Sequence, residues 1–157
     1  MTVGAPTVAT TGKTGLGTSL KMGNGASPEV FSPIANVVSI DGPSETLETV
    51  DATHLLSPNF FREKLPHLKD GGQVTTTIQF DPNTATQSQT TGLKKKYDDR
   101  VLTHFQIDFS GAGVTGDNMV SFSAYVTNLG KAVAVDRIIE MAVTLTCSGE
   151  VVWGPAA

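Results

Sequence analysis

Alternation of hydrophobic and polar residues dominates the pattern along this chain, and alternation of this kind predicts β-strands. In residues 73–81, every second position from Val74 to Phe80 shares one face, and the other face is polar. Such a strand is half-buried, with one side on the core and the other in water. The same reasoning predicts strands over residues 18–22, 34–41, 101–111, 119–128 and 136–147.

The last two predicted strands are long and are joined by a short segment, NLGKA, at residues 128–132. We interpret this segment as a turn. The strand that follows it has an apolar row and a polar row, as expected of a sheet with one face in water. Its apolar row comprises Ile139, Met141, Val143, Leu145 and Cys147. Trp153 follows near the end of the chain, and we expect it to pack on the body of the protein or on a neighbour.

A helix is predicted between two of the strands, at residues 82–99. Asp81 is a suitable N-cap, and Pro82 occupies the first helical position, where its missing N–H costs nothing. Leu93 and Tyr97 stand four residues apart and would dock the helix on the sheet.

The connection at residues 45–72 does not follow the same pattern. It alternates briefly, and it is then broken by Pro58 and Pro66 and ends in two glycines. We therefore assign it to a long inter-strand contact loop. A connection this rich in large apolar residues cannot place them all in a small core, which favours a surface covered by another molecule. Its large apolar residues are Leu55, Leu56, Phe60, Phe61, Leu65 and Leu68.

Composition agrees with a mostly β protein of one domain. The chain has 157 residues, of which 39% are hydrophobic and 17% charged, with 16 glycines and 8 prolines. This length suits a single core. Residues 1–17 are rich in Thr and Gly without periodicity, so we expect a flexible N-terminal arm before one domain at residues 18–157.

Charge and targeting signals narrow the class of partner. The formal net charge of −4 excludes a general nucleic-acid binder, which needs clustered Lys and Arg. The N-terminus has no signal-peptide pattern, and no apolar run of about 18 residues occurs, so we expect a soluble protein without a membrane partner. The single cysteine, Cys147, is expected to be a free, buried thiol in a reducing compartment.

A metal or catalytic site is the alternative interpretation of the apolar loop. His54 and His67 lie near Asp51, Glu63 and Asp70, but their spacing matches no closed zinc pattern. No serine stands in a G-x-S-x-G motif. We therefore expect no enzyme, no metal and no cofactor, and we interpret the third histidine, at position 104, as a polar surface residue.

The segment at residues 124–149 resembles the most recognisable part of lambda-like siphophage tail tube proteins. In that family a strand ends at a turn bearing Gly-Lys-Ala-Val, and a long final strand follows. Here Gly130, Lys131, Ala132 and Val133 match that turn. The order of the predicted elements over residues 18–149 is also similar to the order in the family.

The resemblance implies a fold and an assembly. It implies a mainly β fold of two packed antiparallel sheets, β-sandwich or barrel-like, flanked by one α-helix. It further implies hexameric rings that stack into a tube for genome delivery, with residues 45–72 contacting the adjacent ring. The expected partners are other copies of the chain and the tape-measure, tail terminator and tail tip or baseplate proteins. The expected location is the virion tail, after assembly in the host cytoplasm.

Double-stranded DNA would pass through such a tube without specific binding. If six subunits contribute about four strands each, the wall holds about 24 strands, enough to enclose a wide channel. Neutral or acidic groups should line it, because Lys and Arg would hold the phosphates. Glu48, Asp51 and Glu140 are lumen-facing candidates from strand phase. The alternatives are a type VI secretion or baseplate tube subunit of the same fold, or a capsid-decoration or adhesion module.

Overall fold

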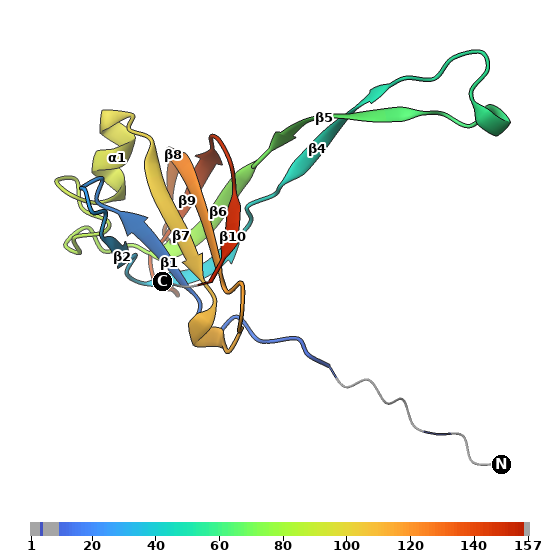
Figure 1. The fold of residues 1–157 in the computed structure, drawn as a ribbon. Helices are drawn as coiled ribbons and strands as arrows, with labels where there is room; N and C mark the ends of the chain where they lie inside the picture. Colours follow the sequence, from blue (N-terminus) through green and yellow to red (C-terminus); the bar gives the residue numbers. More distant parts are fainter. Residues whose placement is uncertain (1–3, 5–9, 156–157) are drawn as a thin grey trace.

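The computed structural model describes Gly4 and residues 10–155. Residues 10–17 are exposed and lie before the first strand, whereas residues 1–3 and 5–9 of the predicted arm lie outside the described residues. The described chain is mainly β, with a large sheet, a two-stranded sheet and one α-helix (Figure 1). None of its helices is long and apolar enough to cross a membrane.

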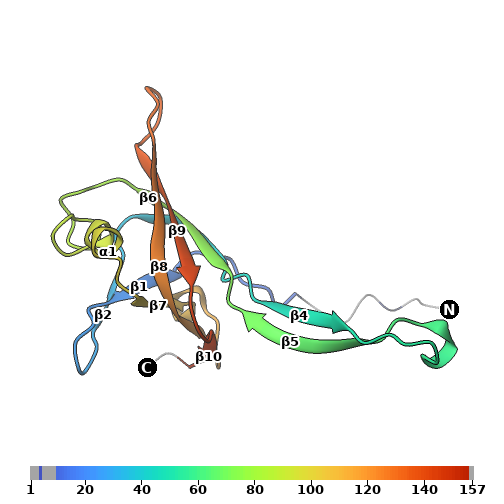
Figure 2. The same ribbon diagram turned by 90° about the horizontal axis from the view of Figure 1, so that it is seen from above.

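The large sheet is antiparallel and has the strand order β2-β1-β7-β8-β9-β6-β3, with β10 paired to the start of β8. It curls so that β3, at one end, approaches the segment that leads into β1, near the other end (Figure 2). Its strands are β1 (Ser19–Gly23), β2 (Phe31–Pro33), β3 (Val37–Asp41), β6 (Gln73–Gln79), β7 (Thr103–Asp108), β8 (Met119–Ala132), β9 (Glu140–Cys147) and β10 (Val152–Gly154). The prediction of a mainly β fold with two antiparallel sheets and one helix is confirmed.

The hydrophobic core fills the inside of this curl. The alternation of β6 is confirmed, because Val74, Thr76 and Ile78 are buried while their neighbours are not. Phe105 of β7 stacks on Phe122 of β8, with ring centroids 5.8 Å apart. Leu20, Leu93, Ile107, Val143 and Leu145 complete the most deeply buried set.

The predicted helix at residues 82–99 is mostly wrong. Only α1 (Leu93–Asp99) is helical, and residues 82–92 form turns. The chain folds tightly back on itself before the helix, since a Cβ on Gly92 would lie 2.4 Å from the carbonyl carbon of Thr86. As predicted, Leu93 docks the helix in the core, whereas Tyr97, for which the same role is predicted, remains exposed.

The predicted turn in the C-terminal half is also wrong. β8 continues through Gly130, Lys131 and Ala132, which pair with β9 in register, and only Val133 lies in the connection at residues 133–139. A bulge between Val126 and Asn128 lets β8 extend along its partner.

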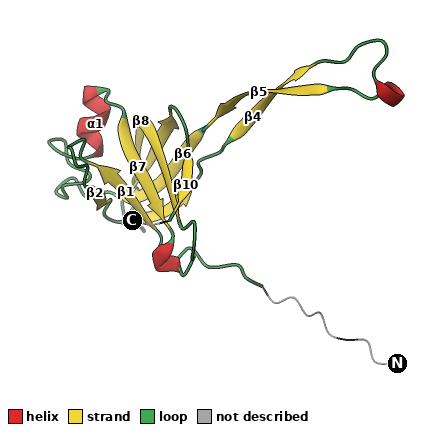
Figure 3. Ribbon diagram, viewed as in Figure 1, coloured by secondary structure: helices red, strands yellow, loops and turns green. Residues whose placement is uncertain are grey.

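The third correction concerns residues 45–72, which form a hairpin. β4 (Thr46–Asp51) and β5 (Lys64–Asp70) pair antiparallel with a bulge, and the 3-10 helix η1 (Pro58–Phe60) lies at the tip (Figure 3). Pro66 pairs opposite Thr49 within β5. A strand with a partner on one side only can accept a proline, because the missing N–H can face solvent. A second 3-10 helix, η2 (Ser110–Ala112), follows β7.

Candidate functional site

The β4–β5 hairpin projects from the curled sheet as an arm (Figures 1 and 2). Backbone segments approach each other closely where the arm leaves the body. At the root, a Cβ on Gly42 would lie 2.4 Å from the Gln73 carbonyl oxygen, and one on Gly72 would lie 2.3 Å from the Ser44 carbonyl oxygen. Both glycines have positive φ, at 110° and 69°. The two chain segments therefore pass each other at a distance that only glycine permits.

A polar network holds the tip of the hairpin. The Ser57 hydroxyl donates a 2.6 Å hydrogen bond to the Glu63 carboxylate, and the same carboxylate oxygen lies 3.3 Å from His54 Nε2. The backbone N–H of His54 donates to Ser57 Oγ at 3.0 Å. The Thr53 hydroxyl accepts from the backbone N–H of Glu63 at 3.0 Å. These bonds join Thr53, His54, Ser57 and Glu63 to one another and hold the backbone of the tip.

The same backbone turns the large apolar side chains outward. Asn59 and Phe60 have φ of 53° and 63°, which is uncommon for any residue other than glycine and an outlier for an aromatic one. Phe60 is 98% exposed. A strained residue that presents an aromatic ring to water suggests a functional surface. The residues predicted to form the contact between successive rings of subunits are all exposed on this hairpin. They are Leu55, Leu56, Phe60, Phe61, Leu65 and Leu68.

The histidines do not come together. His67 pairs with Glu48 at 3.2 Å, His54 pairs with Glu63, and His104 lies 2.6 Å from Glu29. Within Gly4 and residues 10–155, no three His, Cys, Asp or Glu side chains are grouped as a metal site requires. The alternative of a metal centre at His54 and His67 therefore has no support in this part of the chain.

The lumen-facing candidates are spread over two parts of the molecule. Glu48 and Asp51 lie on the hairpin, where hydrogen bonds from Thr53 lower the pKa of the exposed Asp51 carboxyl. Glu140 begins β9 and pairs with Gln79, at the end of β6 away from the hairpin. They do not share a face, and their orientation toward a lumen stays a prediction.

In the C-terminal half Cys147 differs from expectation, and the packing of Trp153 on the body or on a neighbour stays a prediction. Cys147 is half-buried beside Gly71 and Val151, and desolvation raises the pKa of its thiol. Trp153 is largely exposed on β10, and its indole N–H donates a 3.1 Å hydrogen bond to Glu45 at the hairpin root.

A second exposed apolar tip was missed in the sequence. It consists of Val133, Val135, Ile138 and Ile139 in the β8–β9 connection. The sequence pattern assigns Ile139 to the apolar row of the following strand, whereas in the structure Ile139 is exposed in the connection. The four apolar residues within seven positions were the available signal.

Structural comparison places the fold among tail tubes. The tail of an empty gene transfer agent particle, refined with C6 symmetry, matches at TM-score 0.72 and 17% identity, covering 90% of this chain and 98% of that one. The SPP1 tail tube matches at TM-score 0.66 and 11% identity, covering 92% and 80%. The sheath-tube complex of an extracellular contractile injection system matches at TM-score 0.60 and 12% identity, covering 88% of each chain.

Sequence comparison assigns the family. No curated protein sequence matches the chain significantly. The family model for the lambda phage tail tube protein, however, matches residues 14–154, which include every strand of both sheets. The chain therefore belongs to the lambda phage tail tube protein family.

Proposed function

We propose that this chain is the structural subunit of a phage tail tube, assembling as stacked hexameric rings that carry the genome into the host. The observation that carries the proposal is the projecting hairpin with its exposed apolar tip. Among the described residues, the core cluster takes no side chain from this hairpin. Its large apolar residues therefore add nothing to the core of the monomer, and they fit a surface that becomes buried on assembly.

In this proposal the hairpin is the contact between successive rings. It supplies a rigid tip, held by Ser57 and Glu63, and an apolar surface around Phe60 and Phe61. A rigid element loses little conformational entropy on binding, which favours repeated assembly. The stacking surface comprises Leu55, Leu56, Phe60, Phe61, Leu65 and Leu68.

The proposed tube function implies further protein partners. Related structures include the tube-terminating cap of the anti-feeding prophage and a sheath/tube terminator. By analogy we infer that this tube meets terminator, tape-measure and tip proteins, in a virion tail assembled in the host cytoplasm. Double-stranded DNA would pass through the lumen without specific contacts. The likeness to contractile injection system tubes keeps a secretion or baseplate tube as the second candidate.

Electron microscopy of the purified protein tests the proposal. Wild-type protein at high concentration should form rings and tubes. A Phe60→Ser, Phe61→Ser variant should form far fewer tubes, because burying one such side chain contributes about 2 kcal/mol. We expect at least a tenfold rise in the concentration at which tubes appear, measured by sedimentation.

The control is Val30→Ser, which removes an exposed apolar side chain from the main domain. It should assemble as the wild type does. Wild-type protein that stays monomeric at every concentration would contradict the tube function and would favour a decoration or adhesion module. Normal tubes from the double variant would contradict the role of the hairpin while leaving the tube function in place.

A further inference from the structure

An apolar groove runs along the seam of the curled sheet. It lies between β3 and the segment that leads into β1, and its volume is about 550 Å³. Leu16, Val37, Val38, Ile40, Ile107 and Phe109 contribute its apolar side chains, and glycines 15, 17 and 42 also line it. None of the residues that line it is charged. We call this surface the seam groove.

The seam groove is open because the sheet does not close. β3 pairs with β6 on one side, and along the described chain no strand pairs with its other edge. Val38, at the bulge of β3, is 55% exposed. An uncovered strand edge beside exposed apolar side chains is a site where another chain can bind.

Tube growth restricts what can cover the hairpin tip. A tip that met the same tip of another copy would form a closed, symmetric dimer, and growth would stop. A tube needs a heterologous contact, in which the tip of one copy meets a different surface of the next. This step rests on the proposed function.

We propose that the seam groove receives Phe60 and Phe61 from the hairpin tip of a second copy of this chain. The groove is concave and uncharged, while the tip is convex and presents apolar side chains around an internally satisfied polar network. The groove also reaches Gly42, at the root of its own hairpin. Each copy thus offers a groove at the base of the arm that it extends to the next copy.

The other candidate surfaces fit the tip less well. The groove at the hairpin root is lined by Glu45, Lys69, Asp70 and Glu150, whose charges would be desolvated by two phenylalanines. The apolar tip of the β8–β9 connection is itself an exposed end of a hairpin, so it offers no cavity. The seam groove alone among these three combines concavity with an uncharged lining.

Disulfide trapping in assembled tubes tests the contact. In a Cys147→Ser background we introduce Phe60→Cys together with Val38→Cys, and we oxidise the tubes. Within one chain the hairpin holds its tip far from the seam (Figure 1). A bond between the two positions therefore links two copies. We expect a ladder of covalent multimers on a non-reducing gel, because a disulfide requires Cα atoms within about 7 Å.

Two controls separate the alternatives. Phe60→Cys paired with Val135→Cys should give no ladder, although Val135 is fully exposed and apolar. Phe60→Cys alone should give no dimer, since a dimer would mean that tips meet tips. A ladder from the Val135 pair, a dimer from the single variant, or no ladder from the Val38 pair in well-formed tubes would overturn the proposal.

A charge in the groove gives an independent measurement. Val38→Arg should leave the thermal unfolding of the subunit unchanged, because Val38 is largely exposed, and should reduce tube formation at least tenfold. Val135→Arg should assemble normally. Normal tubes from Val38→Arg would overturn the seam groove while leaving the tube function in place. Absence of tubes from the wild type would overturn the tube function and the groove together.

Discussion

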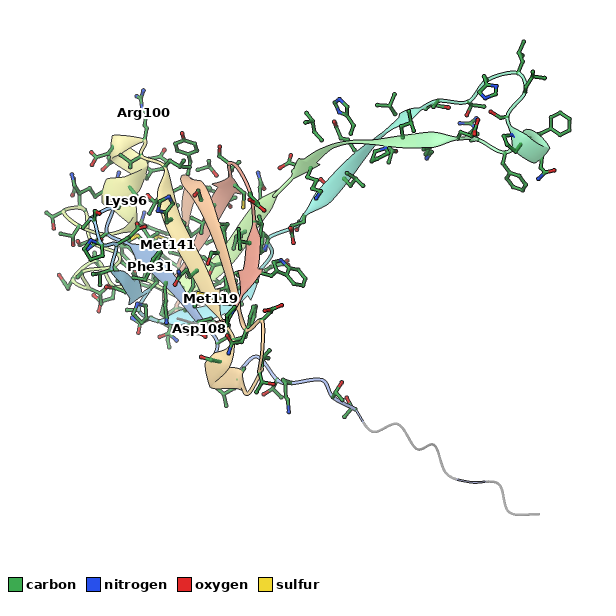
Figure 4. The ribbon with its side chains drawn as sticks, viewed as in Figure 1. Phe31, Lys96, Arg100, Asp108, Met119 and Met141 are labelled. Atoms are coloured by element: carbon green, nitrogen blue, oxygen red, sulfur yellow. The ribbon has the colours of Figure 1, made fainter. Side chains whose placement is uncertain are left out.

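Asp108 shows how one residue ties the sheet together. It ends β7 (Figure 4). Its carboxylate accepts a 2.9 Å bond from the Lys21 ammonium of β1 and a 2.9 Å bond from the backbone N–H of Ser110. Hydrogen bonding from Ser110, and then from Lys21, lowers the pKa of Asp108 to about 2. The charged form is therefore favoured in the folded protein.

Asp108→Asn should reduce the free energy of unfolding by about 2 kcal/mol at pH 7, following the shift of its pKa from 3.8 to about 2. Since the folded-state pKa is lowered, this stabilisation is present above the unfolded pKa and is lost as the pH falls from about 4 toward 2. Urea denaturation of both proteins across this range measures the effect. Asp117→Asn, at an exposed position, is the control. A difference that persists unchanged at pH 2 would refute this account.

At the scale of elements, the hairpin and the curled sheet are each stabilised mainly by their own interactions. The sheet contains the core, while the hairpin is stabilised by its own ladder and by the network around Glu63. The contacts that join them lie at the root, and they include the close approaches at Gly42 and Gly72, the packing of Gly71 on Cys147 and Val151, and the bond from Trp153 to Glu45. The arm can therefore be specialised for assembly without a cost to the fold.

Replacing residues 52–63 by Asn-Gly tests this separation. Asp51 and Lys64 are already paired across the hairpin, so a two-residue turn can join them. We expect the melting temperature of the subunit to stay within about 3 °C of the wild-type value, because no core side chain is removed. Differential scanning calorimetry measures it. A substantially larger fall would mean that the tip stabilises the body, and tubes formed normally by this variant would contradict its role in stacking.

At the scale of the whole molecule, charge decides what a tube can transport. Each subunit carries a formal charge of −4, and these charges would add together in the proposed ring. An acidic or neutral wall repels or ignores phosphates, whereas clustered cations bind them with strong dependence on salt. The lumen assignment of Glu140 can be tested through this difference.

Tubes of Glu140→Lys should retain double-stranded DNA at low salt and release it at high salt, whereas wild-type tubes should retain none. Co-sedimentation with short duplexes measures retention. Glu150→Lys makes the same change of charge at an exposed position outside the lumen-facing candidates, and it should behave as the wild type. Equal retention by both variants would show that Glu140 holds no special position in the lumen.

Strands were predicted where their side chains alternate, and the structure confirms this for β6, β7 and β9. The side chain of Gln87 shows what a local sequence pattern cannot predict. It is buried, accepts a bond from the Asp81 N–H, and donates to the carbonyls of Ala35 and Gln79. Ala35 is 52 positions away, so nothing local marks this glutamine as the residue that turns a predicted helix into a folded connection.

The sequence composition correctly indicates an exposed apolar surface within residues 45–72. The predicted loop, however, is a hairpin in the structure. The apolar residues around Phe60 were predicted to form an interaction surface, and they are exposed. Pro58 and Pro66 indicated a loop, because proline weakens a central strand. Pro58 lies in the 3-10 helix at the tip, outside both strands. In a two-stranded arm Pro66 can turn its missing donor outward, so its pairing with Thr49 is allowed.

Some properties of this protein are determined by the local sequence pattern, and others by the pairing of strands that are distant in the sequence. The alternation of residues such as Val74 and Ile78 is set by the pleat of a single strand, and the excess of apolar residues at 55–68 is a property of composition, so both can be recognised along the chain. The projection of the arm, the continuation of β8 through Gly130 and the open seam beside Val38 depend on which distant strands pair. Such pairing follows from the total packing of the core and from close approaches at Gly42 and Gly72, and only the folded molecule brings these together.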